Sequence, residues 1–210
     1  MSYSKQLQES KIIAILRKVD TKDVISVVHG LHKGGINVFE VTLDSPKALG
    51  VIEQLSTEVS NDVLIGAGTV LDPASAELAI QHGAKFIVSP TLDLKTIEMT
   101  KKHGTLSIPG CLTPTEIFIA SKNGADMVKV FPANSMGANY FKDLSGPLSH
   151  IPLIATGGID QDNILLYLEA GVSAVGLGSS LVPKKISHSD ELEALTRKTE
   201  KIVQKVGEIS

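Results

Sequence analysis

Two charged residues lie inside apolar segments of this 210-residue sequence, where charges are uncommon. Lys129 lies in the apolar run 127–131, and Glu40 lies in VFEVTL, residues 38–43. Burying either charge is costly unless it is paired or discharged. A desolvated lysine can form a Schiff base with a carbonyl compound, and a nearby carboxylate can move the proton that such chemistry requires. The alternative for both residues is a structural ion pair.

Two glycine-containing loops follow later apolar segments. One contains Thr156, Gly157 and Gly158, and the other contains Gly178, Ser179 and Ser180. Glycine lets backbone N–H groups approach an anion, and a serine hydroxyl adds a donor. Either loop alone could be a tight turn, but two in successive segments predict a phosphate site.

Arg17 and Thr69 also lie where apolar segments end. Arg17 closes IIAILR, and its planar guanidinium suits a carboxylate or a phosphate, unless it is only a solvated strand end. Thr69, in IGAGTV, can donate to a substrate carboxylate or satisfy its own backbone.

The elements that must position these residues follow one repeated pattern. A helix-like segment is followed by a glycine and then by a short apolar run, as in QHGAKFIVSP, residues 81–90. The glycine fits the left-handed residue that ends a helix, and the run predicts a strand. Counting the runs predicts eight strands, at residues 12–17, 38–43, 63–70, 86–90, 106–111, 127–132, 153–158 and 174–179.

Helices are predicted between these strands because capping residues and prolines precede each intervening segment. The predicted helix starts are Thr21 or Asp20, Ser45-Pro46, Asp72-Pro73, Thr113-Pro114 and Asp160. A short helix at 2–10 and a last helix at 190–207 complete the chain.

This alternation predicts the fold class. Buried strands separated by helices indicate a parallel sheet, and eight such units in a chain of this size indicate an α/β protein with a closed (β/α)8 TIM barrel. An open doubly wound sheet is the alternative. No linker or change in composition divides the chain, so residues 1–210 are expected to form a single domain.

Strand geometry then predicts where the two charges point. Alternate residues of a strand face opposite sides, so Lys129 shares a face with Met127 and Phe131, away from the two neighbouring valines. Glu40 likewise lies opposite Phe39 and residues 41 and 43, which suit the helix-facing side. Both charges are therefore expected inside the barrel, where sites form at the carboxyl ends of the strands.

Composition excludes several other classes of protein. The formal net charge is −3 and no basic run is present, so no nucleic-acid partner is expected. No apolar stretch is long enough to span a membrane, and the polar N-terminus lacks a signal-peptide core. The six histidines form no metal cluster, so neither a metal nor another cofactor is expected. Cys111 is the single cysteine, which excludes an internal disulfide, favours a cytoplasmic setting and indicates a packed thiol.

The sequence resembles the 2-keto-3-deoxy-6-phosphogluconate / 4-hydroxy-2-oxoglutarate aldolase family. The resemblance extends from IIAILR to GLGSSLVP, almost the whole chain. Its most specific motifs are EVTL, IGAGTV, FIVSP, IPGCLTPTE, KVFPA and TGGI, in that order and spacing.

The resemblance implies a metal-free class I aldolase, usually a homotrimer, that acts on a small keto acid. It makes Lys129 the Schiff-base lysine and Glu40 the general acid/base. It implies that the pyruvate half is held by Thr69, Pro90 and Phe131, and that the distal hydroxyl and phosphate are held by Thr156, Gly157, Gly158 and Ser179.

One position departs from the family pattern. Many members carry arginine directly after EVTL, where this chain has Asp44. Arg17 could supply the missing charge, and Asp44 is then expected to pair with it or to turn away from the anionic substrate. LDSP, residues 43–46, resembles the LNSP of members that act on the galactonate epimer, whereas ATGG keeps the threonine of the gluconate branch.

The resemblance thus implies an aldolase that releases pyruvate and an aldehyde from 2-keto-3-deoxy-6-phosphogluconate. The galactonate epimer and 4-hydroxy-2-oxoglutarate are alternative substrates. A phosphosugar isomerase or epimerase would share the glycine loops without needing Lys129. A non-catalytic binding barrel would tolerate the loss of Lys129 or Glu40.

Overall fold

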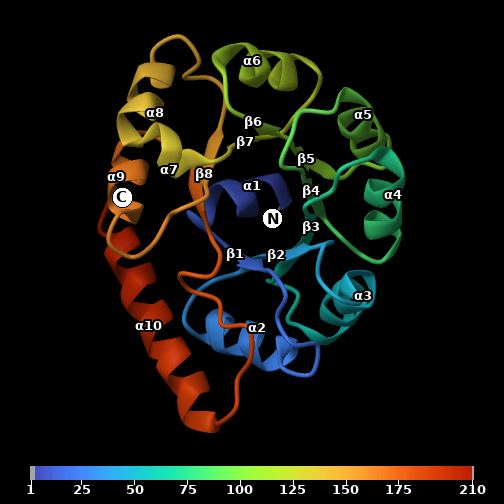
Figure 1. Ribbon diagram of the computed structural model, residues 1–210, viewed down its shortest axis with the longest axis vertical. Coiled ribbons are helices and arrows are strands. Elements are labelled where there is room, and N and C mark those ends of the chain that lie inside the picture. The colour runs from blue at the N-terminus through green and yellow to red at the C-terminus, as the bar shows by residue number, and fades with distance from the viewer. Residues whose placement is uncertain (1–2, 210) are drawn as a thin grey trace.

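The computed structural model describes residues 3–209 and forms a closed parallel barrel surrounded by helices (Figure 1). Its strands follow the order β5-β4-β3-β2-β1-β9-β8-β7-β6, with every pair parallel. Their bounds are β1 (Ile12–Leu16), β2 (Val38–Thr42), β3 (Leu64–Gly68), β4 (Phe86–Val88), β5 (Leu106–Ile108), β6 (Gly110–Cys111), β7 (Val128–Val130), β8 (Leu153–Thr156) and β9 (Ala174–Leu177).

The ring closes through a strand that is broken in the middle. β5 and β6 are two parts of the predicted strand 106–111, separated by Pro109, which has no N–H for the ladder. β5 pairs with β4 and β6 pairs with β7, so the chain itself joins the two ends of the sheet. The predicted TIM barrel is therefore confirmed, and the open doubly wound alternative is wrong.

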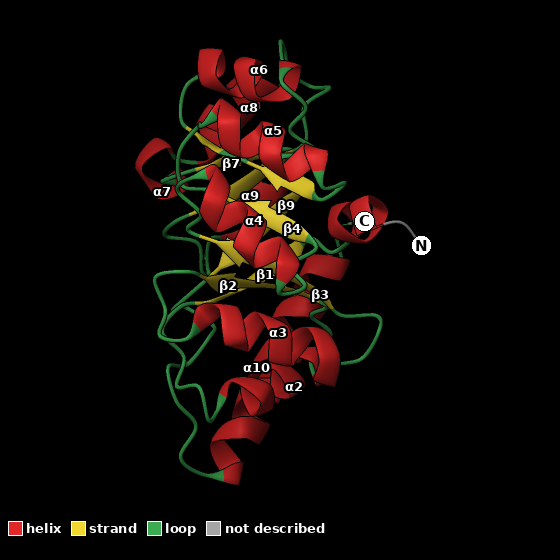
Figure 2. Ribbon diagram, turned by 90° about the vertical axis from the view of Figure 1, so that its right-hand side faces the viewer, coloured by secondary structure: helices red, strands yellow, loops and turns green. Residues whose placement is uncertain are grey.

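Helices surround the strands, and α1 lies across one end of the barrel, opposite α7 (Figures 1 and 2). Their bounds are α1 (Tyr3–Glu9), α2 (Val24–Lys33), α3 (Ala48–Glu58), α4 (Pro73–Gln81), α5 (Leu94–Lys102), α6 (Pro114–Lys122), α7 (Ala133–Met136), α8 (Ala138–Ser145), α9 (Ile164–Glu169) and α10 (Ser189–Gly207). Both terminal helices are present close to the predicted bounds, although residue 2 lies outside the described part of the chain. No helix within residues 3–209 has the length and apolarity needed to cross a membrane.

Two of the five predicted helix starts match the capping pattern, and three do not. Asp72 accepts from the N–H of Ser75 at 2.8 Å, and Thr113 forms a capping box with Glu116, as predicted. The other three predictions are wrong, because α2, α3 and α9 begin three or four residues after the expected caps and not directly after them. In each case the expected cap is used elsewhere. Carboxylate oxygens of Asp20 and Asp160 close turns ahead of α2 and α9, and the hydroxyl of Ser45 binds Lys18 N and Thr42 Oγ1.

The half of the barrel interior near the amino ends of the strands is apolar. One cluster gathers inward-facing residues from seven strands together with Leu7 of α1, which fills the end that α1 covers. Phe86 is its largest strand residue, and the neighbouring strand β3 has Gly66 beside it. A Cβ atom at Gly66 would lie 2.4 Å from the Phe86 ring, so the glycine is required for the ring to fit.

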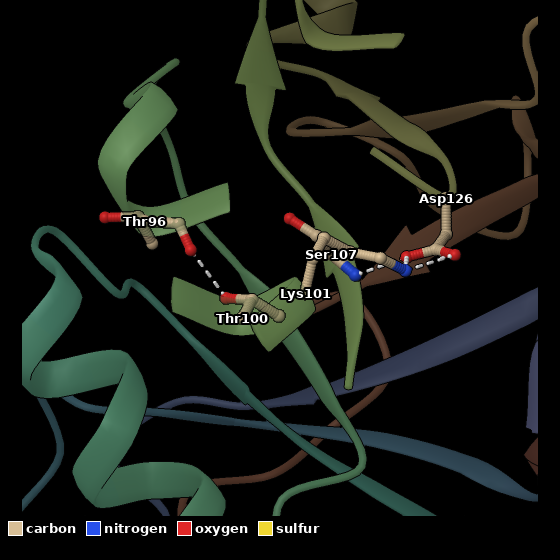
Figure 3. Close-up of polar contacts among 5 residues, drawn as sticks. All are labelled: Thr96, Thr100, Lys101, Ser107 and Asp126. Atoms are coloured by element: carbon tan, nitrogen blue, oxygen red, sulfur yellow. Dashed lines mark hydrogen bonds and ion pairs between the residues drawn. The ribbon is translucent and has the colours of Figure 1, made fainter. Parts of the chain in front are cut away.

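Polar contacts fix β7 at its amino end, opposite the expected site (Figure 3). Asp126, directly before β7, accepts from Lys101 Nζ of α5 at 2.6 Å and from the backbone N–H of Ser107 in β5 at 2.8 Å. Within α5, the Thr100 hydroxyl donates to the carbonyl of Thr96 at 2.7 Å. The strand that carries Lys129 is thus joined to α5 and β5 at its amino end, away from the expected site.

Candidate active site

A cavity of about 570 Å³ lies at the carboxyl ends of the strands. Its lining includes every residue predicted for the site, namely Arg17, Glu40, Thr69, Pro90, Lys129, Phe131, Thr156, Gly157, Gly158, Gly178 and Ser179. The barrel therefore brings together side chains that are up to 162 residues apart in the sequence, the separation of Arg17 and Ser179.

Lys129 projects into this cavity from the middle of β7. The residue is only 6% exposed, while Val128 and Val130 belong to the outer core between strands and helices. Its Nζ lies 5.2 Å from the centre of the Phe131 ring, which forms part of the wall. The described ion pairs do not include Lys129, so its amine is not held in a direct carboxylate bridge.

Glu40 points into the same cavity from β2 and is 3% exposed. Burial raises the pKa of its carboxyl above the ordinary value of 4.5, and the Asp44 carboxylate adds to this effect, whereas Lys129 and Arg17 oppose it. A carboxyl group whose pKa is raised toward neutrality is suited to accept and return a proton. Gly68 leaves space for it, because a Cβ atom there would lie 1.9 Å from Glu40 Oε1.

Arg17 is anchored between two neighbouring loops at the cavity mouth. Its Nη2 donates to Thr69 Oγ1 at 2.8 Å, and its Nη1 lies 3.5 Å from Asp44 Oδ2. Of the two arrangements expected for Asp44, the structure shows the pairing with Arg17. The role of Arg17 as an anion clamp stays a prediction. The Thr69 hydroxyl accepts from Arg17 and keeps its own proton available for a ligand.

The two glycine loops present free backbone donors to the cavity. The carbonyl of Gly157 accepts from Asn134 N at 3.0 Å, and that of Gly158 accepts from Asn163 Nδ2 at 2.8 Å. Within residues 3–209, the N–H groups of Gly157, Gly158, Gly178 and Ser179 donate to no protein group. Unpaired N–H groups gathered in a loop form an anion-binding concavity, which supports the predicted phosphate site.

Several residues that line the cavity were not predicted from the sequence. They are Ile15, Lys18, Ile159, Asp160, Gly176, Val182 and Lys184. Lys18 follows Arg17 directly and could have been found from that position. Lys184 lies in an irregular segment after the last strand, where no local pattern indicates which way a side chain points.

Cys111 lies beside the site and does not contribute a nucleophile. Burial, with a contribution from the Glu116 carboxylate, raises the pKa of its thiol to about 12, so the thiol stays protonated. This agrees with the predicted packed thiol. Within residues 3–209, no group of three or more His, Cys, Asp or Glu side chains is arranged to hold a metal ion.

Comparisons with known proteins agree with this geometry. A family model described as "KDPG and KHG aldolase" matches residues 3–198. The 2-dehydro-3-deoxy-6-phosphogalactonate aldolase of Escherichia coli (strain K12) is 34% identical over 171 residues, which cover 81% of this chain and 83% of that protein. The 2-dehydro-3-deoxy-phosphogluconate aldolase of Haemophilus influenzae is 34% identical over an alignment 210 residues long, which covers 97% of this chain and 98% of that protein.

The solved structures lead to the same family. KDPG aldolase from Legionella pneumophila, with pyruvate captured at low pH as a covalent carbinolamine intermediate, superposes with a TM-score of 0.86. It is 28% identical, and the match covers 96% of this chain and 98% of that one. With a family model that matches nearly the whole chain, the protein belongs to the KDPG and KHG aldolase family.

Proposed function

We propose that the protein is a class I aldolase that cleaves 2-keto-3-deoxy-6-phosphogluconate to pyruvate and glyceraldehyde 3-phosphate. The observation that carries the proposal is the buried Lys129, whose side chain opens onto a cavity that also contains Glu40. Membership of an aldolase family makes the protein a carbon–carbon lyase and weighs against the isomerase and non-catalytic alternatives.

The reaction begins with attack of Lys129 Nζ on the C2 ketone. Loss of water gives a protonated imine, which acts as an electron sink. Glu40, through a water molecule, takes the proton of the C4 hydroxyl, and the electrons of the C3–C4 bond move into the imine as the aldehyde leaves. Glu40 then returns a proton to C3 of the enamine, and hydrolysis releases pyruvate and the free lysine.

The remaining residues hold the two ends of the substrate. We assign the pyruvate carboxylate to Arg17 and Thr69, with Pro90 and Phe131 as the walls around the pyruvate half. Thr156 would bind the distal hydroxyl. The free N–H groups of Gly157, Gly158, Gly178 and Ser179 support their assignment to the phosphate.

The relatives support two epimeric substrates equally. The galactonate aldolase and the gluconate aldolase described above are both 34% identical to this chain. The galactonate epimer is therefore the main alternative, followed by 4-hydroxy-2-oxoglutarate. Cleavage rates measured on the three substrates would rank them.

We further propose that residues 1–210 act as a single catalytic domain in a cytoplasmic homotrimer. This rests on the family resemblance. Light scattering during gel filtration tests it, because a trimer of the 22.3 kDa chain has a mass of about 67 kDa, three times that of the chain.

Borohydride reduction in the presence of pyruvate tests the chemistry. The unmodified protein should gain the mass of one reduced pyruvate adduct, and Lys129→Ala should gain none while losing about a thousandfold or more of its activity. Lys85→Ala is a matched control, because Lys85 precedes β4 at the opposite end of the barrel and should leave trapping intact. An adduct mapped to Lys85 or another lysine would contradict the assignment.

A further inference from the structure

Two lysines that the proposed mechanism does not use line the same cavity as the glycine loops. Lys18 follows Arg17 after β1, and Lys184 lies between β9 and α10, five residues after Ser179. Both also line a second cavity of about 490 Å³, so they lie where the two cavities meet. Within residues 3–209, neither ammonium group has a hydrogen bond or an ion pair with the protein.

The loops that carry these lysines are tied to each other and to their neighbours. The N–H of Asp20 donates to the carbonyl of Lys184 at 2.7 Å, which joins the two loops directly. The backbone N–H of Lys18 donates to Ser45 Oγ at 2.8 Å. Lys18 has a φ of 55°, a conformation that is unfavourable for a residue other than glycine and persists where the surroundings hold it.

The acidic residues around the lysines are already engaged. Asp44 pairs with Arg17, and Asp20 lies 3.8 Å from Lys22 Nζ while it also caps a turn. Asp160 Oδ1 accepts two backbone N–H groups, at 2.9 and 3.0 Å. Lys18 and Lys184 are therefore open to an anionic ligand, since they and the Schiff-base Lys129 are the described cations of the first cavity whose charged groups have no hydrogen bond or ion pair with the protein.

We propose that Lys18 and Lys184 clamp the terminal phosphate of the substrate and thereby make the phosphorylated sugar acid the preferred substrate over its unphosphorylated form. The clamp adds two positive charges to the backbone donors of the glycine loops. Lysine binds phosphate as a flexible point charge, which suits a group at the end of a mobile chain. The inference rests on the proposed aldolase function and extends it to substrate selection.

The test compares kcat/KM for 2-keto-3-deoxy-6-phosphogluconate with kcat/KM for unphosphorylated 2-keto-3-deoxygluconate. Lys18→Gln and Lys184→Gln should each lower the ratio of these two values about tenfold, the usual scale for loss of a charge-assisted contact. The double variant should lower the ratio further than either single variant does. Lys184→Arg, which keeps the positive charge, should retain most of the ratio of the unmodified protein. An unchanged ratio in both single variants would overturn the clamp.

Two control variants separate a contact from general electrostatics. Lys185→Gln removes the same charge one residue away, but Lys185 lines the second cavity and does not line the first, so the ratio should not change. Arg17→Gln, at the proposed carboxylate end, should weaken both substrates by a similar factor. A loss in Lys185→Gln equal to that in Lys184→Gln would mean that long-range attraction acts in place of a clamp, and would overturn it.

Failure of this inference can be told apart from failure of the proposed function. Borohydride trapping of pyruvate by the unmodified protein depends on the lysine chemistry and involves no phosphate. Without trapping, the proposed function fails. With trapping and an unchanged ratio in the Lys18 and Lys184 variants, the clamp alone fails.

Discussion

Glu40 experiences opposing electrostatic effects at the centre of the site. Burial raises the pKa of its carboxyl, while the positive charges of Lys129 and Arg17 lower it. Because the net effect is a raised pKa, Glu40 exchanges its proton closer to neutrality than an exposed glutamate does. This property gives a testable role to the carboxylate that is separate from imine formation.

Glu40→Gln keeps the shape of the side chain and removes the base. We expect pyruvate to remain trappable on Lys129 by borohydride, in part, while exchange of deuterium into the pyruvate methyl group slows by about a hundredfold or more. Exchange followed by NMR measures this directly. An unchanged rate would reject Glu40 as the proton shuttle.

The pH dependence of this exchange should respond to the two charged neighbours in opposite directions. Exchange requires the deprotonated Glu40, so its rate falls as the pH drops through the Glu40 pKa. The Asp44 carboxylate raises that pKa, so Asp44→Asn should move the acid limb of the profile to lower pH. The Arg17 guanidinium lowers it, so Arg17→Gln should move the limb to higher pH. Shifts of the same sign in both variants would contradict this account.

At the scale of elements, β2 and β3 together create the space for the Glu40 carboxyl. Glu40 pairs in register with Gly66, and Gly68 lies two residues further along β3 on the same face. Any side chain at position 68 would occupy the volume of the carboxyl group. The second glycine of IGAGTV, Gly68, is thus required by the Glu40 side chain of the neighbouring strand.

Gly68→Ala should therefore displace Glu40 and slow pyruvate exchange nearly as much as Glu40→Gln does. Gly50→Ala is the matched control, because Gly50 lies in α3, where an added Cβ atom would have no neighbouring atom within 4 Å. It should leave exchange unchanged and stabilise the fold by at most about 0.5–1 kcal/mol, since alanine has a higher helix propensity than glycine and Gly50 lies in the first turn of α3. Full exchange activity in Gly68→Ala would show that the carboxyl can move aside without loss.

At the scale of the whole molecule, the barrel is closed at one end and open at the other. Leu7 of α1 joins the interior cluster and seals the amino end, while the polar residues and the cavity occupy the carboxyl end. Stability and catalysis are thereby assigned to opposite ends of one barrel.

Leu7→Ala should test this separation. Loss of a fully buried leucine leaves a cavity and should lower the free energy of unfolding by about 2–4 kcal/mol, while kcat falls little. Leu71→Ala, at a position that is 61% exposed, should change stability by less than about 0.5 kcal/mol. Urea denaturation and steady-state kinetics on both variants provide the measurements. A kcat loss in Leu7→Ala comparable to that of a site variant would contradict the separation.

The sequence by itself determined the repeated helix-and-strand units and the inward direction of Lys129 and Glu40. It also identified eleven of the residues that line the cavity. Each of these follows from local rules. Glycine ends helices, alternate residues of a strand face opposite sides, and parallel strands place their carboxyl ends at one edge.

Tertiary structure decided the features that depend on contacts between distant loops. The number of units predicted a closed barrel, but the sequence left an open sheet as an alternative because the two folds share the same local pattern. The pairing of β5 with β4 and of β6 with β7, on either side of Pro109, decided for the barrel. Of the three misplaced helix starts, those of α2 and α9 were misplaced for a local reason, because Asp20 and Asp160 accept from N–H groups two or three residues ahead and so close turns in front of the helices. The start of α3 depends on a contact between distant loops, because Ser45 binds the N–H of Lys18, which only the folded chain brings near. The anchoring of Arg17 and the place of Lys184 likewise depend on hydrogen bonds and packing between separate loops, which no periodicity in the sequence encodes.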